Sequence, residues 1–413
     1  LSTYQTLYLQ LMNYFIASLL VVFSFCSFGQ TENFWTKKND FAGLKRERAV
    51  SFTVGDFAYL GTGIDTAEMV LNDFWKYSPT TDTWSQVADL PGSVRRDAIA
   101  FAIDDFGYVG TGMNANEASE IGAQPLNDFW QYHPASNSWL QKANYPGSFG
   151  NGVYFATGFA IDSKGYLCGG KMGPNFYSNQ LWEYKPSINQ WTQLANFPGG
   201  LRYQLSSFTV GYKAYVGLGT DQDLYRKDIW QFDATTNQWT ARADFPASER
   251  GSATTFSIGQ RGFVTTGANG GLLDDLWEYN PLTDNWSIKS TYGGSPRKNA
   301  TGFVVNGKAY VGTGKGYSGK KASMHEYTPG SVLGTGELGI ELAIYPNPTS
   351  DIVYLNYEAQ EIDQIELYSI SGELLHVDGA IKQLEISHFS AGNYILIGRK
   401  NTKIVSTQPL IIQ

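Results

Sequence analysis

The chain has 413 residues, of which 42% are hydrophobic and only 16% are charged, so it is apolar enough to bury a large core. Its 11 tryptophans, 26 tyrosines and 24 phenylalanines stand beside 45 glycines, a composition typical of all-β proteins built from many short strands. The formal net charge of −8 argues against a nucleic-acid partner, and two cysteines, Cys26 and Cys168, cannot supply a disulfide framework or a cysteine-based metal cluster.

The N-terminal residues are predicted to form a targeting segment. Tyr14 to Phe28 is an apolar run that is too short for a membrane-spanning helix. Ser27 and Gly29 place small residues at the −3 and −1 positions of a signal-peptidase site. We therefore expect residues 1–29 to be a signal peptide, with Met12 as an alternative true start, and no membrane span after its removal.

Ten of the eleven tryptophans form five pairs whose members are nine residues apart. The pairs are Trp75/Trp84, Trp130/Trp139, Trp182/Trp191, Trp230/Trp239 and Trp277/Trp286. Successive pairs are 55, 52, 48 and 47 residues apart, and a period near 50 indicates a propeller, a solenoid or an array. Because ten indoles recur at one register, packing between repeats explains them better than an exposed ligand platform does.

Each pair belongs to one strand pattern, which reads Asn-Asp-Phe-Trp-Lys-Tyr-Ser-Pro from Asn72 to Pro79. Alternation places Trp75 and Tyr77 on one face of this strand and Phe74 on the other, so both faces are apolar, as they are between stacked propeller blades. Upstream of the pattern, an aromatic residue is followed four residues later by a glycine, which predicts one backbone geometry repeated six times. The six glycines are Gly63, Gly112, Gly170, Gly219, Gly267 and Gly314.

The two ends of the repeat region complement each other. Trp35 matches the second tryptophan of a pair but has no first member ahead of it. Met324 to Pro329 matches the strand of the first tryptophan, with His325 in the tryptophan position and no strand behind it. We therefore expect the N-terminal strand to be the outer strand of a sixth blade, which closes the ring and removes free sheet edges.

These repeats resemble the Kelch family, whose repeat has a glycine doublet ending its second strand, a tyrosine in its third and a tryptophan in its fourth. The resemblance covers residues 34–329 and implies a six-bladed Kelch β-propeller over residues 30–329. Only Gly169-Gly170 keeps the doublet intact, since the other repeats carry Gly-Thr-Gly, Gly-Leu-Gly or Thr-Thr-Gly at this place.

The tryptophans stop after the propeller, and residues 330–340 form a glycine-rich segment that is predicted to be a linker. Residues 341–413 alternate like short strands between turn signals, which predicts a small β-sandwich. The expected strands are Ile352 to Tyr357, Ile365 to Ile370, Leu374 to Val377, Leu384 to Ile386, Tyr394 to Arg399 and Lys403 to Thr407. Pro409 is expected to interrupt the terminal strand.

This tail is similar to the type A sorting domain of the type IX secretion system of the Bacteroidetes. The matching motifs are Tyr345-Pro346-Asn347-Pro348, Leu367-Tyr368-Ser369-Ile370-Ser371-Gly372 and Ser390-Ala391-Gly392-Asn393-Tyr394. The resemblance implies that residues 341–413 engage the type IX secretion machinery and route the chain through the outer membrane. The mature protein would then be secreted, or attached to the outer cell surface through lipopolysaccharide.

Five repeats carry an arginine at the same register, in the loop that leads into the first strand. The arginines are Arg46, Arg95, Arg202, Arg250 and Arg297. Because the first strand of a blade is innermost in a propeller, these loops surround one mouth of the central channel. The guanidiniums are therefore predicted ligand-binding groups for a carboxylate or an anionic glycan. The alternative is that each arginine caps its blade by bonding backbone carbonyls.

The loops between second and third strands open on the same face and vary most between repeats, as binding loops do. They carry Asp65, Glu68, Asn114, Asn116, Glu117, Glu120, Lys171, Asn175, Tyr177, Asp221 to Arg226 and Lys315 to Lys321. Such scattered and chemically mixed groups suit recognition better than a single reaction.

The sequence therefore favours an extracellular binding module, expected to be a monomer, that presents one loop face to an unknown protein or glycan. One alternative is a sugar epimerase or mutarotase similar to the Kelch-type bacterial sialic acid mutarotase, with Glu47 and Glu249 as the nearest carboxylates by register. Another is a surface scaffold without a small ligand. Since no catalytic, phosphate-binding or metal-ligand motif occurs, we predict no catalytic residue, no metal and no cofactor.

Overall fold

The computed structural model describes residues 33–116, 123, 125–147, 152–222, 224–330, 342–357, 361–369, 374–400 and 403–413. The predicted signal peptide and residues 331–340 of the predicted linker lie outside the described residues. Every regular element in the described part is a β-strand, so the predicted all-β class is confirmed. It follows that none of the described segments is a helix able to cross a membrane. The chain divides into two compact units, one ending at Pro329 and the other beginning at Gly330.

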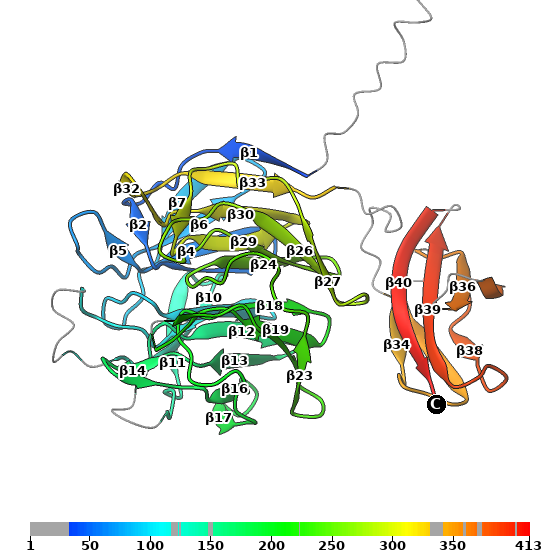
Figure 1. Ribbon diagram of the computed structural model, residues 1–413. Helices are drawn as coiled ribbons and strands as arrows, with labels where there is room; N and C mark the ends of the chain where they lie inside the picture. The colour runs from blue at the N-terminus through cyan, green and yellow to red at the C-terminus, as the bar shows by residue number, and fades with distance from the viewer. Residues whose placement is uncertain are drawn as a thin grey trace, which may run out of the picture. The chain divides into compact units, whose positions relative to one another are not determined.

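The first unit is a propeller of six antiparallel four-stranded sheets, numbered here as blades one to six along the chain (Figure 1). The first, innermost strands are β3 (Val50–Val54), β8 (Ile99–Ile103), β12 (Thr157–Ile161), β18 (Ser206–Val210), β24 (Thr254–Ile258) and β29 (Thr301–Val305). The second strands are β4 (Phe57–Gly61), β9 (Phe106–Gly110), β13 (Lys164–Cys168), β19 (Lys213–Gly217), β25 (Arg261–Thr265) and β30 (Lys308–Gly312). The third strands are β6 (Phe74–Ser78), β10 (Phe129–His133), β16 (Leu181–Lys185), β22 (Ile229–Asp233), β26 (Leu276–Asn280) and β33 (Met324–Thr328). The fourth strands are β7 (Thr83–Val87), β11 (Ser138–Lys142), β17 (Gln190–Gln193), β23 (Gln238–Arg242), β27 (Asn285–Ile288) and β1 (Phe34–Lys38).

The ring closes between blades six and one. Each innermost strand contacts the next, and β29 of the last blade contacts β3 of the first. The fourth strand of blade six is β1, which pairs with β33 so that Trp35 lies opposite Tyr327 with ring centroids 5.1 Å apart. The N-terminal strand therefore completes the last blade in the arrangement that the sequence predicts.

Aromatic side chains fill the spaces between blades. Tyr77 packs on Tyr310 of blade six at 5.4 Å, whereas Phe74 of the same strand packs on Trp139 of blade two at 5.0 Å. Both Phe74 and Tyr77 are almost fully buried. The third strand is thus apolar on both faces because each face meets a different neighbouring blade, and burial of such rings is the main stabilising contribution available to the propeller.

The second tryptophan of a pair also joins its blade to the preceding one through a hydrogen bond from its indole, a contact that we call the clip. The indole Nε1 of Trp139 donates a hydrogen bond to the carbonyl of Ala88 at 2.9 Å, and three further blades repeat this contact. These are Trp191 to Ala143, Trp239 to Ala195 and Trp286 to Ala243. Among the described residues, the buried Nε1 atoms of Trp35 and Trp84 have no hydrogen-bond partner. The two blades that meet where the ring closes therefore lack this clip.

The six repeat glycines share the backbone geometry that their spacing predicts. All have a positive φ, between 79° and 103°. In Gly112, where φ is 99°, a Cβ atom would lie 2.8 Å from the carbonyl oxygen of Arg96. Neither the conformation nor the space admits a side chain here, which explains a glycine at this register in every blade.

Replacing Gly112 with alanine is expected to lower the free energy of unfolding by about 2 kcal/mol, because it adds a clash with backbone to an unfavourable φ. Urea unfolding followed by tryptophan fluorescence measures this loss. The matched control is Gly211→Asn, at a turn where φ is 56° and a Cβ would meet nothing within 4 Å. That control is expected to lose less than about 1 kcal/mol, and equal losses for the two variants would refute the close-approach explanation.

Blade six has a histidine, His325, at the position where the other five blades have the first tryptophan of a pair. His325 is 7% exposed and lies within hydrogen-bond distance of the Tyr292 hydroxyl, at 3.2 Å. Burial lowers the pKa of His325 to about 4, and the charges of Arg297 and Lys37 act in the same direction. The folded protein therefore holds this imidazole neutral, whereas the unfolded chain protonates it near its ordinary pKa of 6.5.

The stabilisation from neutral His325 is complete above pH 6.5 and is lost as the pH falls toward 4, by about 3 kcal/mol over the whole interval. His325→Phe should remove this part of the pH dependence, since phenylalanine does not titrate. The measurement is the difference in unfolding free energy between the two proteins at several pH values from 7 to 4. A difference that does not change over this range would contradict the prediction.

The second unit is a small sandwich of two sheets. One sheet has the order β34 (Ala343–Tyr345), β35 (Ile352–Asn356) and β38 (Gln383–Glu385). The other has the order β37 (Leu374–Gly379), β36 (Gln364–Ser369), β39 (Gly392–Lys400) and β40 (Lys403–Ile412). The prediction that Pro409 interrupts the last strand is wrong, because β40 continues to Ile412. It lies at the edge of its sheet, where a residue without an N–H is tolerated.

Candidate functional site

Short strands gather on one face of the propeller, where the loops into the first strands meet the loops between second and third strands. We call this the loop face. Its short strands are β2 (Arg46–Glu47), β5 (Ile64–Asp65), β14 (Lys171–Gly173), β15 (Phe176–Tyr177), β20 (Thr220–Asp221), β21 (Leu224–Tyr225), β28 (Arg297–Lys298), β31 (Lys315–Gly316) and β32 (Gly319–Lys320). These short strands pair with one another in blades one, three, four and six, which gives the backbone of those loops a regular conformation.

The five repeated arginines do not present their guanidiniums at this mouth. Each is at most 2% exposed. Arg95 donates two parallel hydrogen bonds to the Asp128 carboxylate, at 2.9 and 2.6 Å, and one to the carbonyl of Thr111. Asp128 also accepts a hydrogen bond from the indole of Trp130 at 2.6 Å. Equivalent pairs join Arg46 to Asp73, Arg202 to Asp228 and Arg250 to Asp275.

These contacts occupy the donors that a ligand would need. Although burial pushes the pKa of Asp128 upward, the hydrogen bonds and charge of Arg95 outweigh it and hold that pKa below its usual value. Blade six differs, since Arg297 meets the Ser323 hydroxyl and backbone carbonyls instead of a carboxylate. The geometry supports the capping interpretation, and ligand binding by the five arginines stays a prediction.

A second set of equivalent residues forms the mouth itself. In each blade, the residue two positions after the arginine register donates its backbone N–H to the backbone carbonyl of the equivalent residue in the preceding blade. The N···O distances run from 2.9 to 3.3 Å. The last of these bonds runs from Arg48 to Asn299, which closes a ring of six hydrogen bonds. All six residues have a positive φ, between 53° and 61°. We call them the mouth ring: Arg48, Asp97, Phe155, Gln204, Ser252 and Asn299.

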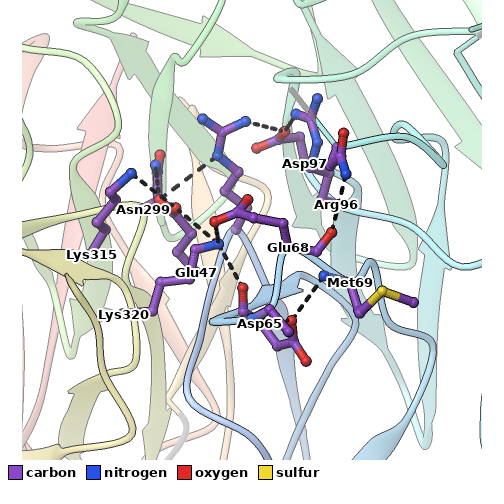
Figure 2. A network of polar contacts seen from close by, with 12 residues as sticks. Glu47, Asp65, Glu68, Met69, Arg96, Asp97, Asn299, Lys315 and Lys320 are labelled. Carbon is purple, nitrogen blue, oxygen red and sulfur yellow. Dashed lines mark hydrogen bonds and ion pairs between the residues drawn. The ribbon is translucent and has the colours of Figure 1, made fainter. Parts of the chain in front are cut away.

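The blades from six through one to two contribute a charged part of the mouth, which we call the charged cluster (Figure 2). It comprises Glu47, Arg48, Glu68, Arg96, Asp97, Asn299, Lys315 and Lys320. Glu47 accepts a hydrogen bond from the amide of Asn299 at 2.8 Å and lies 3.9 Å from the ammonium of Lys320. The same ammonium binds Glu68 at 2.7 Å. The cluster therefore joins the last blade to the first across the closure of the ring.

Asp97 is one of the two buried acids of the charged cluster, beside Glu47. Its carboxylate lies 3.2 Å from the guanidinium of Arg48 and also pairs with Arg96. Burial raises the pKa of Asp97, while the positive charges of the two arginines oppose that rise. A buried carboxyl with a raised pKa at the mouth of a channel is a candidate for ligand binding or proton transfer.

Blades three and four contribute an aromatic part, the aromatic cluster, which comprises Tyr154, Phe155, Lys171, Tyr177 and Tyr203. The rings of Tyr177 and Tyr203 are stacked, with centroids 5.2 Å apart. The ammonium of Lys171 lies between 5.1 and 5.7 Å from the centroids of Tyr154, Tyr177 and Tyr203. Phe155 connects the two parts, because the Arg48 guanidinium lies 4.9 Å from its ring.

The two carboxylates predicted for an enzyme are not brought together as an acid and base pair. Glu47 is buried in the charged cluster, whereas Glu249 is exposed, and no hydrogen bond or ion pair joins them in the described structure. Of the polar loop residues, Glu68, Lys315 and Lys320 meet in the charged cluster. Glu117 and Glu120 lie outside the described residues. No group of histidine, cysteine or acidic side chains within the described ranges could hold a metal ion.

Sequence reasoning missed the mouth ring. Its six members have nothing in common as residue types, since they include an arginine, an acid, two amides, a serine and a phenylalanine. A usable signal was their fixed offset from the arginine register, which places one residue of each blade two positions before the first strand.

Six four-stranded blades wedged by buried aromatic rings define the class of the first unit, a β-propeller with one loop face. The solved structure of YjhT aligns with a TM-score of 0.61 and 16% identity over 71% of this chain and 97% of that one. At this identity the likeness shows the fold alone, and it confirms the predicted propeller.

Models of known protein families match both the repeats and the C-terminal tail. Residues 153–314 match the KLHDC2/KLHL20/DRC7 Kelch-repeats domain, and residues 63–91 match the Kelch motif. Residues 343–413 match the secretion system C-terminal sorting domain. The chain thus carries Kelch repeats followed by a sorting domain of type IX secretion, as the motifs predict.

Curated relatives match only part of the propeller. Kelch-like protein 21 of Danio rerio is 29% identical over 86 residues, which are 21% of this chain and 13% of that protein. The protein of the same name from Rattus norvegicus is 30% identical over 80 residues, 19% of this chain and 13% of that protein. Since the matches span about an eighth of these relatives, they support Kelch repeats and carry no activity to this chain.

Proposed function

We propose that the protein is an extracellular binding module that holds a protein or glycan ligand at the mouth of its propeller, on the loop face. The carrying observation is the mouth ring, whose closed backbone hydrogen bonds fix the positions of six residues, one from each blade. Mixed charges on one part and aromatic rings on the other suit recognition of a ligand with both polar and apolar groups.

The sorting domain supports the extracellular setting. A secretion sorting domain marks its chain for export. We propose that residues 341–413 engage the type IX machinery, and that the propeller acts either released from the cell or attached to its surface. The binding function therefore belongs to the propeller, and the tail supplies its location.

Binding at the mouth is tested with the purified full chain on arrays of glycans and of peptides. Ligands of the mouth should lose at least tenfold in affinity when Lys171→Glu or Lys315→Glu reverses a charge there. Lys185→Glu is the matched control, because Lys185 is an exposed lysine at the turn on the opposite face of blade three. Binding that is indifferent to both mouth variants would contradict the proposed site.

An enzymatic alternative rests on one observation, the buried Asp97 carboxyl with its raised pKa between two arginines. A sugar mutarotase or epimerase requires a group that transfers a proton, and Asp97 is better placed for this than the predicted Glu47 and Glu249. Proton-exchange NMR on free sialic acid tests it. Faster anomer exchange with the protein, lost in Asp97→Asn, supports the enzyme, and an unchanged exchange rate excludes it for this sugar.

A further inference from the structure

The aromatic cluster contains a cation, Lys171, that forms no ion pair with another described residue. The carboxylates of the charged cluster all have cationic partners: Glu47 and Glu68 share Lys320, and Asp97 meets Arg48 and Arg96. The ammonium of Lys171 instead contacts only aromatic rings, and no carboxylate of the described residues pairs with it. Among the described residues, the aromatic cluster therefore carries one positive charge without an acidic partner.

The surroundings of Lys171 are unusually apolar for a charged group. Tyr154 is fully buried and Tyr203 is 9% exposed, and together with Tyr177 they enclose one side of the ammonium. The neighbouring Phe176 at the tip of the same hairpin is 48% exposed. In this partly desolvated setting a carboxylate gains more from an ammonium than it would in water.

The backbone conformation at Phe155 is shared by the whole mouth ring but is unusual for an aromatic residue. Phe155 occupies its position in the mouth ring with φ of 56°, a conformation that is rare for a bulky side chain. Asparagine, aspartate or glycine would adopt it more easily. The phenylalanine ring nevertheless extends the aromatic surface from Tyr203 to Arg48.

From these contacts we infer that the aromatic cluster is a docking site for a peptide segment that carries an acidic side chain flanked by apolar ones. The inference rests on the proposed function and names its ligand. The acidic group would pair with Lys171, and its apolar neighbours would cover Tyr177, Phe176 and Phe155. Tyrosine and phenylalanine are enriched at protein interfaces, and tyrosine is frequent among the residues that carry most of the binding energy.

A peptide fits this cluster better than a saccharide does. Sugars need several polar side chains to bind their hydroxyl groups. Beside Lys171 the aromatic cluster offers tyrosine hydroxyls but no carboxylate or amide side chain, and the carboxylates of the charged cluster are already paired with cations. Exposed Phe176 likewise offers area to an apolar side chain.

The test selects ligands from a random dodecapeptide display library with the full chain, beside an array of carboxylate-bearing glycans. Selected peptides should contain an aspartate or glutamate next to apolar residues, and Lys171→Gln should weaken their binding at least tenfold. Tyr177→Phe, which keeps the ring, should retain binding, whereas Tyr177→Ala should weaken it. Lys185→Gln is the control that leaves binding unchanged.

The outcomes separate the inference from the proposed function. Acidic glycans that bind and depend on Lys171, with no peptide selected, would overturn the peptide ligand and leave mouth binding intact. Selected peptides without acidic residues, or peptides that bind Lys171→Gln as tightly as the native chain, would also overturn the inference. Ligands of either kind that ignore Lys171 and Lys315 alike would overturn both.

Discussion

Replacing Asp128 with alanine is expected to lower the free energy of unfolding by about 3 kcal/mol, because Arg95 would keep its buried charge and lose its counter-charge. Arg95 is 0% exposed and has its bidentate contact only with this carboxylate. Urea unfolding at neutral pH measures the loss. Asp105→Ala, at an exposed turn in the same blade, is the control and should change stability by less than about 0.5 kcal/mol.

Blade six supplies the converse experiment. Its Arg297 is buried and forms no ion pair with a carboxylate of the described residues, and burial lowers the pKa of this guanidinium. Ser323→Asp would recreate the pair that the other arginine-bearing blades have, and it should stabilise the protein by about 1 kcal/mol. A neutral effect of Asp128→Ala together with a destabilising effect of Ser323→Asp would show that the pairs do not support the blades.

Replacing Trp35 with alanine should loosen the ring of blades at one place, blade six. The indole packs on Tyr292 at 5.0 Å and on Tyr327 at 5.1 Å, and it fastens the only blade whose fourth strand comes from the other end of the chain. Removal of such a ring costs about 3 kcal/mol. Because Trp35 and Trp84 also lack the indole-to-carbonyl clip, we expect the loss to act locally.

Hydrogen exchange distinguishes local opening from general destabilisation. In Trp35→Ala, amides of β1 and β33 should exchange markedly faster while those of blade three keep their protection. Trp286→Ala is the matched variant, since it removes the equivalent indole from blade five, where the chain is continuous between third and fourth strands. Uniformly faster exchange in Trp35→Ala would argue that closure by β1 is no weaker than the other blade junctions.

The sequence predicts the propeller well because the aromatic packing that holds the blades together is repeated along the chain. Trp75, Trp84 and their copies recur at one register, and a side chain buried in the same way five times leaves a pattern that a single chain reveals. The prediction for Pro409 failed for a related reason. Whether a proline ends a strand depends on whether that strand lies at the edge of its sheet, and the local sequence does not contain that information.

The site was harder to predict. The arginine register is correct, but an arginine at a loop looks the same whether it faces a ligand or folds back onto Asp128. The deciding partner lies 33 residues further along the chain. The mouth ring is built by backbone groups, so its residue types follow no consensus. Only the folded ring brings Lys171 of blade three beside Tyr203 of blade four.

In the mouth ring, backbone atoms hold the proposed binding site together, while the side chains determine its chemistry. Because backbone atoms make the six closing bonds, the amino acids at those positions can be exchanged without dismantling the opening, provided that they accept a left-handed conformation. Natural variation, or a designed library at six codons, could thus give one scaffold many ligand preferences while the blades stay the same.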